Sequence, residues 1–292
     1  MIMILMKHRG LSLLVVCTLA LSGCVSPSPA PSDKISVAVG IYPYAYLAQE
    51  IGGEHVSVTN LTQPGVEPHD LELTAKQVAT IATSDLVIYQ TGLQPAVDSA
   101  VREADLPHLV EVTTVVPLKD YDPHIWLDPM RMAVVAQAIA QELIGIDPDN
   151  EVAYTEGLAS LTSTLTSIDT EYTTGLAHCQ RMDFITSHAA FSYLADAYGL
   201  TQIPISGLSP DAEPSPERIT EIHRIAEEKG LTTIFFETLA SPALAQAIAD
   251  DLGLETDVLD PLEGITDQSR GNDYSEVMAS NLVALRKANG CS

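Results

Sequence analysis

The body of the chain alternates short apolar runs with longer stretches in which apolar residues recur every three or four positions. Short runs rich in β-branched residues are typical of strands, and the longer pattern is typical of helices. In the first half, the predicted strands are 35–39, 55–61, 86–89 and 109–113, and the predicted helices between them are 42–51, 74–83 and 94–103. Alternation of this kind predicts a largely parallel sheet with helices on both faces.

A similar alternation returns after Cys179. The predicted strands there are 184–186, 202–205, 233–236 and 256–259, and the predicted helices are 189–198, 215–229, 242–252 and 274–289. Between the halves, the stretch from Asp149 to Ala177 keeps apolar residues on one helical face. At 1.5 Å per residue, such a helix would be ~40 Å long, enough to cross a domain. The expected fold class is therefore α/β, with two parallel-sheet lobes joined by one long helix.

The first 24 residues have the features of an export signal. Lys7 and Arg9 precede an apolar run from Leu11 to Leu21, which is shorter than the ~20 residues of a membrane-spanning helix and fits a secretory signal. The run ends in Leu-Ser-Gly-Cys, which resembles a lipobox and predicts that Cys24 carries the lipid. An ordinary signal peptide with a chance cysteine is the alternative. Serine and proline dominate 25–33, as in a flexible tether.

These features divide the chain into five parts: a signal peptide (1–23), a lipid-anchored tether (24–34), an N-terminal lobe (35–148), a linking helix (149–178) and a C-terminal lobe (179–292). The mature protein is expected at the outer face of the cell membrane, held by Cys24. Its body keeps two cysteines, Cys179 and Cys291, and an exported protein with an even number of body cysteines is expected to pair them. Two free thiols or a redox pair are the alternatives.

The charge of the chain narrows the classes of partner. It has 14 Lys and Arg against 39 Asp and Glu, a formal net charge of −25. Binding to nucleic acid or to anionic lipid headgroups needs clustered basic residues, so neither is expected. The sequence has no GxxxxGK[ST] or GxGxxG loop, no GxSxG elbow and no HExxH helix. Any energy-coupled role would therefore need another subunit, and the remaining partners are cations or neutral molecules.

Three of the eight histidines lie at or just past the carboxyl ends of predicted strands: His69, His124 and His188. Asp260 ends the last predicted strand in the same way. Ligands of open α/β sheets collect at these strand ends. Three imidazoles and one carboxylate form a plausible four-ligand site for a divalent transition metal.

Each of these residues also has a structural interpretation. His69 and His124 could be loop histidines fixed by neighbouring prolines, and Asp260 before a proline could be a turn former. Glu237 also ends a strand and could replace or orient a ligand. For His188, a metal-binding role is favoured because Ser187 is a good N-cap, which would put the imidazole at the positive end of the helix 189–198. That position favours the neutral ring that binds metal.

The chain resembles the metal-binding (zinc/manganese) solute-binding lipoproteins of ABC importers, also called cluster A-I or the adhesin-B type. The matching segments are Pro68-His69-Asp70, 122–129 (DPHIWLDP), 186–193 (TSHAAFSY) and 213–216 (EPSP). The resemblance implies two α/β lobes joined by a rigid helix, with the metal bound between them by His69, His124, His188 and an acidic residue transferred to Asp260. Many zinc-specific members have a His-rich loop before the second histidine, whereas the segment 117–123 is short and has none.

The ligand types favour zinc, because imidazole suits Zn²⁺ whereas Mn²⁺ prefers more oxygen ligands. In the family that the chain resembles, the third position is typically His in zinc binders and Glu in manganese binders, so His188 favours zinc and leaves Mn²⁺ as the alternative. The predicted function is capture of Zn²⁺ by a monomeric, non-enzymatic protein for an ABC permease with a separate ATPase subunit. The rival classes are a zinc hydrolase with Glu237 as general base and a surface adhesin.

Overall fold

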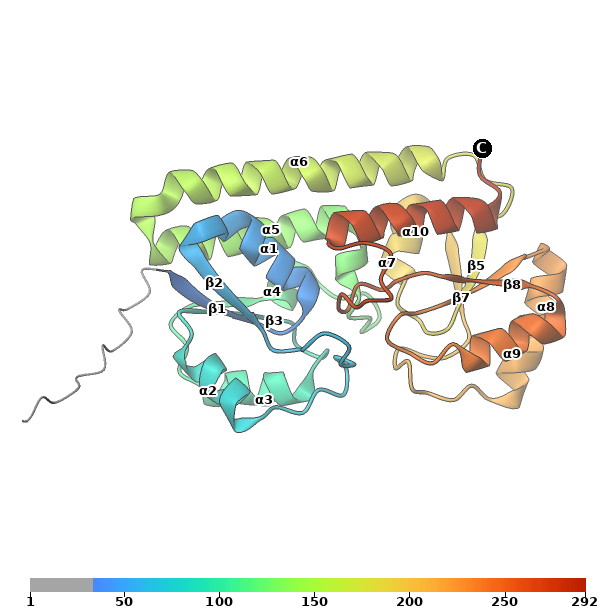
Figure 1. Ribbon diagram of the computed structural model, residues 1–292, viewed down its shortest axis with the longest axis horizontal. Coiled ribbons are helices and arrows are strands. Elements are labelled where there is room, and N and C mark those ends of the chain that lie inside the picture. The colour runs from blue at the N-terminus through green and yellow to red at the C-terminus, as the bar shows by residue number, and fades with distance from the viewer. Residues whose placement is uncertain (1–33) are drawn as a thin grey trace, which may run out of the picture. The chain divides into compact units, whose positions relative to one another are not determined.

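Four parallel strands form the first sheet of the computed structural model, which describes residues 34–292 (Figure 1). They are β1 (Ile35–Val39), β2 (Val56–Asn60), β3 (Leu86–Tyr89) and β4 (Leu109–Glu111), in the order β2-β1-β3-β4. All four residues of β3 are buried, which explains its unbroken apolar run. The predicted signal peptide, the tether and Cys24 lie outside the described residues.

Helices cover both faces of this first sheet, as the alternating pattern predicts. One face packs against α2 (Ala75–Thr83) and α3 (Pro95–Glu103), and the other packs against α1 (Tyr42–Gly52) and α5 (Pro129–Ile146) (Figure 1). A single turn of helix, α4 (Val112–Val115), follows β4 directly, so the predicted strand 109–113 ends two residues early. This sheet and its helices are the first lobe.

A second sheet of the same kind forms the second lobe. Its strands are β5 (Asp183–Thr186), β6 (Thr201–Pro204), β7 (Thr233–Phe236) and β8 (Glu255–Val258), all parallel and in the order β6-β5-β7-β8. The helices of this half are α7 (Ser192–Tyr198), α8 (Pro216–Lys229), α9 (Ala243–Leu252) and α10 (Tyr274–Asn289). The predicted fold class, two parallel-sheet lobes with one long connecting helix, is confirmed.

The connecting helix α6 (Glu151–Gly175) has 25 residues and runs alongside α5, α1 and α10 (Figure 1). Its buried positions are Tyr154, Leu161, Leu165, Ile168 and Tyr172, the apolar face that the sequence pattern predicts. Gly157 lets it approach α1 closely, because a Cβ at this position would lie 2.5 Å from the carbonyl oxygen of Ile51. One continuous core therefore joins both lobes through this helix.

The helix α5 was not predicted, although it has 18 residues. Asp128 caps its first turn by accepting hydrogen bonds from the backbone N–H groups of Met130 and Arg131, and Pro129 occupies its first position. Its buried residues are Pro129, Met132, Val135, Ala136, Ile139, Ala140 and Leu143. Both the cap and the helical spacing are visible in the sequence, so this helix was predictable.

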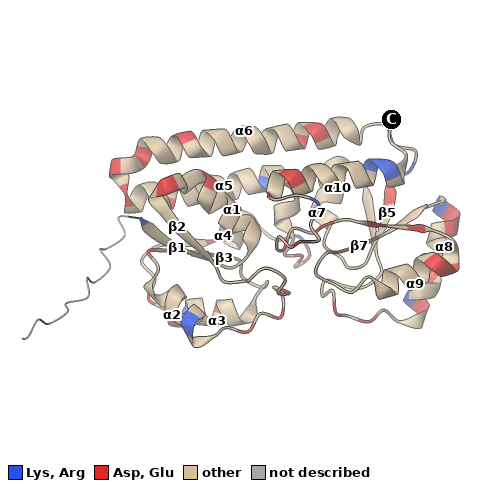
Figure 2. Ribbon diagram, in the orientation of Figure 1, with Lys and Arg blue, Asp and Glu red and all other residues tan. Residues whose placement is uncertain are grey.

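The predicted disulfide between Cys179 and Cys291 is confirmed and closes a loop with a sequence separation of 112. It ties the segment after α6 to Cys291, which lies two residues past the end of α10. Acidic side chains occur along α6 and on α8, and α6 has no basic residue (Figure 2). Among the residues that the structure describes, no helix is long and apolar enough to cross a membrane.

Candidate metal centre

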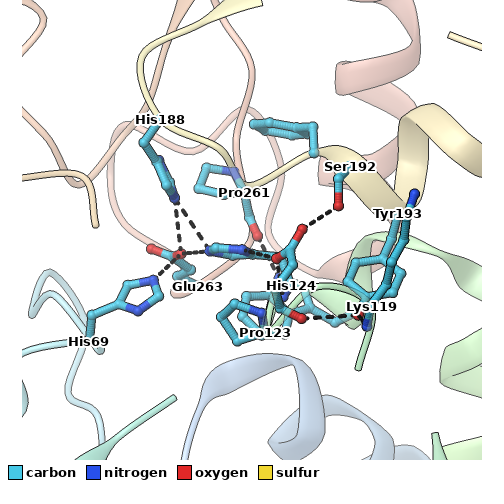
Figure 3. A network of polar contacts seen from close by, with 12 residues as sticks. His69, Lys119, Pro123, His124, His188, Ser192, Tyr193, Pro261 and Glu263 are labelled. Carbon is cyan, nitrogen blue, oxygen red and sulfur yellow. Dashed lines mark hydrogen bonds and ion pairs between the residues drawn. The ribbon is translucent and has the colours of Figure 1, made fainter. Parts of the chain in front are cut away.

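Three histidines and one glutamate meet where the carboxyl ends of the strands of both lobes face each other (Figure 3). His69 lies in the loop between β2 and α2, and His124 immediately precedes a single 3₁₀ turn, Ile125–Leu127. His188 follows β5 in the second lobe, and Glu263 lies in the loop between β8 and α10. Each lobe therefore supplies two of the four side chains.

The Nε2 atoms of the three imidazoles surround one oxygen of Glu263. From Glu263 Oε1, the distance is 3.2 Å to Nε2 of His69, 3.1 Å to Nε2 of His124 and 3.7 Å to Nε2 of His188. The Nε2 atoms of His124 and His188 are 3.3 Å apart. One ligand atom from each residue lies within 4.8 Å of the others.

These separations fit a single tetrahedral ion. Four ligands bound to zinc at ~2.0–2.1 Å lie roughly 3.3 Å from one another. The measured distances from Glu263 Oε1 to the three Nε2 atoms, 3.1 to 3.7 Å, bracket that value. The other carboxylate oxygen, Oε2, is buried and has no hydrogen-bond partner among the described residues. The donor types and these separations therefore fit a zinc ion bound by all four residues.

Burial of the site is uneven. The side chains of His124, His188 and Glu263 are fully buried, whereas the His69 side chain is 13% exposed. Next to the site, a cleft of about 850 Å³ separates the segment Pro64–Gly65 of the first lobe from second-lobe residues that include Thr238 and Asp267. Of the four side chains, only that of His69 is therefore in contact with solvent.

The structure does not bring Asp260, the expected fourth ligand, into this group; the carboxylate in the group belongs to Glu263. Asp260 lies two residues past the end of β8, and its Oδ1 accepts a hydrogen bond from the backbone N–H of Leu262, which forms a turn. Glu263 follows Asp260 by three residues, and its carboxylate lies beside the three imidazoles. The sequence did contain a signal for Glu263 as a second candidate for the acidic ligand, because it is the one charged residue in the segment from Pro261 to Ile265.

Residues 37–288 match the family model described as zinc-uptake complex component A, periplasmic. The match covers both lobes and all four residues of the site. The chain belongs to this family. The resemblance inferred from the sequence is thereby confirmed.

Curated relatives agree with this assignment. The chain is 32% identical over 309 residues to the high-affinity zinc uptake system protein ZnuA of Bacillus subtilis, covering 96% of this chain and 97% of the relative. It is 32% identical over 306 residues to the zinc-binding lipoprotein AdcA of Streptococcus pneumoniae R6, covering 97% of this chain but only 61% of AdcA. The chain therefore spans about three fifths of the length of AdcA.

A solved structure of one relative shares the fold. The crystal structure of the Zn(II)-bound ZnuA-like domain of Streptococcus pneumoniae AdcA superposes with a TM-score of 0.77 at 34% sequence identity. The superposition covers 88% of this chain and 99% of that domain. The two lobes and the long helix of this family member therefore correspond to a known zinc-bound architecture.

Within this family member, His124 is held by Asp122. The Nδ1 atom of His124 lies 2.7 Å from Oδ1 of Asp122, which also accepts the backbone N–H of His124 at 3.0 Å. The other oxygen, Oδ2, accepts the hydroxyl of Ser192 at the start of α7, so one carboxylate joins a metal-site residue of the first lobe to the second lobe. Burial lowers the pKa of His124, but its hydrogen bonds to Asp122 and Glu263 outweigh this and raise the pKa to about 9.

His188 has a matching partner in Glu237. The Nδ1 atom of His188 lies 2.6 Å from Oε1 of Glu237, which also accepts the backbone N–H of His188 at 3.3 Å. Glu237 is predicted from the sequence to replace or orient a ligand, and its contacts fit the orienting role. Because Glu237 binds the Nδ1 side of the ring, it leaves Nε2 free to face the site.

The expected cap at His188 is wrong. The helix α7 begins at Ser192, not at 189, and Phe191 is its N-cap residue. The hydroxyl of Ser187 donates instead to Glu237, a residue far away in sequence. His188 is therefore oriented by a carboxylate rather than by a helix terminus.

Charges in the metal-free site influence one another. Burial acts to raise the pKa of Glu263, but hydrogen bonds from His124 and His69 override it and hold the pKa well below the usual range. Glu67 accepts the backbone N–H of His69 at 3.1 Å. Burial, together with the charge of Glu263, raises the pKa of Glu67 to about 7. His124 and Glu263 thus each favour the charged form of the other.

Proposed function

We propose that this protein captures Zn²⁺ outside the cytoplasm and delivers it to an ABC-type permease. The observation that carries the proposal is the His₃Glu group, whose four donor atoms come from both lobes and lie within 4.8 Å of one another. A site assembled from two lobes can form and open with small changes in their separation, which suits a carrier.

Carriage is favoured over catalysis because four protein ligands complete the tetrahedral shell of zinc. Catalytic zinc sites use three protein ligands and keep the fourth position for water or substrate. Glu237, the general base of the rival hydrolase, binds the Nδ1 atom of His188 and faces away from the metal position. The protein is therefore proposed to be a binding component without enzymatic activity.

Zinc is favoured over manganese by the donor set. Three of the four donors are imidazole nitrogens, which suit Zn²⁺, whereas Mn²⁺ prefers more oxygen ligands. The relatives support the same metal: the Bacillus subtilis relative is described as a high-affinity zinc uptake protein and AdcA as a zinc-binding lipoprotein. Mn²⁺ remains the competing cargo in the test below.

The partners follow from the same proposal. The sequence has no nucleotide-binding loop, so the energy for uptake comes from a separate ATPase subunit attached to the permease. Export and a lipid on Cys24 would keep the protein, as a monomer, at the outer face of the membrane beside that permease. Changing Cys24→Ser should release the mature protein into the soluble fraction; a variant that stays with the membrane would contradict the anchor.

The metal assignment is tested by competitive titration of the purified protein against a chromophoric chelator, with Zn²⁺ and Mn²⁺ in parallel. We expect one Zn²⁺ per chain, Mn²⁺ binding weaker by orders of magnitude, and a large loss of zinc affinity in His124→Ala and His188→Ala. His223→Ala is the matched control, because this histidine lies on α8, away from the His₃Glu group, and pairs with Asp251. Tighter binding of Mn²⁺, or unchanged zinc affinity in either site variant, would overturn the assignment.

A further inference from the structure

The four residues Asp260–Glu263 form a turn whose conformation determines where Glu263 lies. Oδ1 of Asp260 accepts the backbone N–H of Leu262 at 2.8 Å. Leu262 has a φ of 59°, in the left-handed region that residues other than glycine rarely adopt. Its side chain is fully buried. A leucine persists in this conformation only where its surroundings enforce it.

The backbone at the start of the turn is fixed by Asn281 of α10. The side-chain oxygen of Asn281 accepts the N–H of Asp260 at 2.9 Å, and its nitrogen donates to the carbonyl of Asp260 at 2.7 Å. Asn281 is 2% exposed. The turn therefore begins from a rigid point inside the second lobe.

The middle of the turn is held from the first lobe. The indole N–H of Trp126 donates to the carbonyl oxygen of Pro261 at 2.6 Å. Trp126 is fully buried and lies two residues after His124, and its own carbonyl accepts the hydroxyl of Tyr274 at 2.7 Å. The rings of Trp126 and His124 are 5.2 Å apart. The same short segment thus carries one metal-site histidine and contacts the turn that carries Glu263.

We propose that Asp260 and Trp126 are positioning residues that hold the Asp260–Glu263 turn so that the Glu263 carboxylate meets the three imidazoles. Asp260 acts from within the turn, and Trp126 acts across the two lobes. The proposal rests on the proposed metal-binding function, and it assigns to Asp260 a role other than that of a metal ligand.

The side chain of Asp260 distinguishes these roles. Oδ1 accepts the backbone N–H of Leu262. The carboxylate is buried, which raises its pKa, and the side chains of Ser269 and Thr238 beside it act to lower that pKa. Asparagine keeps an acceptor at the Oδ1 position but loses the negative charge that a metal ligand would supply. A positioning residue should therefore tolerate Asp260→Asn and fail in Asp260→Ala, whereas a ligand should fail in both.

A double-mutant cycle with Glu263→Ala tests whether Asp260 acts through Glu263. In the otherwise unchanged protein, Asp260→Ala should weaken zinc binding on the order of tenfold, and Asp260→Asn by less than about threefold. In the Glu263→Ala background, which keeps three imidazoles, Asp260→Ala should change zinc affinity by less than about twofold. Two results would overturn the proposal. One is an equal loss of zinc affinity in Asp260→Asn and Asp260→Ala. The other is a loss from Asp260→Ala that is as large in the Glu263→Ala background as in the otherwise unchanged protein.

The cross-lobe contact is tested by the same cycle with Trp126→Phe, which removes the N–H donor and keeps an aromatic ring. In the otherwise unchanged protein, Trp126→Phe should weaken zinc binding on the order of tenfold. In the Glu263→Ala background, it should change zinc affinity by less than about twofold. Thermal unfolding of each metal-free variant shows whether that variant folds. If Asp260→Ala does not fold, the Trp126→Phe cycle alone tests the proposal. An unaltered affinity in Trp126→Phe would refute the proposal, whereas failure of the wild-type protein to bind zinc would refute the proposed function instead.

Discussion

Nε2 of His124 and Oε1 of Glu263 lie 3.1 Å apart, although the two residues belong to different lobes. Both side chains are fully buried. Each has a pKa that the other shifts in the direction that favours its charged form. The contact between these two residues therefore joins the two lobes at the proposed metal site.

The fourth donor is tested by Glu263→Gln, which keeps the shape of the side chain and removes its charge. Zinc affinity should fall by at least about tenfold, because the variant loses the one carboxylate of the group. The matched control is Asp267→Asn, an exposed carboxylate that lines the neighbouring cleft and is not part of the His₃Glu group. Calorimetric titration that finds similar affinities in the two variants would remove Glu263 from the site.

The carboxylate that orients His188 should matter without touching the metal. Glu237→Gln should lower zinc affinity by about tenfold, because the neutral amide can still accept a hydrogen bond from the ring but no longer increases its basicity. The control is Glu142→Gln, since Glu142 pairs with His108 in the same way, at 3.1 Å, on the surface. Zinc titration of the two variants gives the comparison, and an equally small effect in both would mean that orientation of His188 is unimportant.

The metal-free protein should lose stability as the pH rises from neutral. The pKa of His124 is raised from 6.5 to about 9, so its charged form contributes stability that is complete below pH 6.5 and is lost as the pH rises through about 9. Chemical denaturation of chelator-treated protein at pH 6.5 and pH 9.5 measures this loss. His124→Gln, which cannot become charged, should lose less stability over the same interval; an identical loss in both proteins would contradict the shifted pKa.

The zinc-loaded protein should respond in the opposite sense. Zinc binds only the neutral imidazole, so metal binding must release the proton that His124 carries in the metal-free site. Apparent zinc affinity should therefore rise with pH up to about 9, approaching tenfold per pH unit for this one proton. Competition titrations at pH 6, 7 and 8 would show the slope, and a flat profile would mean that no histidine proton is displaced.

The disulfide should stabilise the fold without shaping the metal site. In the chain-entropy model, closing a loop with a separation of 112 residues stabilises by about 4–5 kcal/mol. Cys179→Ser with Cys291→Ser should therefore lower the melting temperature on the order of 10 °C. Zinc affinity at 25 °C should stay unchanged, because neither cysteine contacts the His₃Glu group. Scanning calorimetry and zinc titration check the two parts separately.

Much of the fold and the three histidines could be predicted because they depend on local pattern. Apolar runs identify strands, and the loops after their carboxyl ends contain His69, His124 and His188. The meeting of these histidines across two lobes was implied by the family resemblance. The helix α5 was missed although its cap at Asp128 and its apolar spacing are local signals of the same kind. The sequence therefore contains enough information to predict this helix.

The fourth donor and the setting of His188 depend on contacts between distant segments. Whether Asp260 or Glu263 reaches the imidazoles is decided by a left-handed Leu262 and by a hydrogen bond from Trp126, neither of which leaves a local sequence signal. Ser187 has the composition of a helix cap, but Glu237 competes for its hydroxyl. Where both partners are buried, such tertiary contacts determine the local structure more strongly than the propensity of the local sequence does.

The most direct test of the central claim is X-ray absorption spectroscopy at the zinc edge on protein loaded with one equivalent of Zn²⁺. The account predicts four ligands, three imidazole nitrogens and one oxygen at ~2.0–2.2 Å, with the oxygen contribution altered in Glu263→Ala and preserved in Asp260→Asn. A shell with fewer than three imidazoles, or with an oxygen that persists unchanged in Glu263→Ala, would contradict the closed His₃Glu site and the carrier function built on it.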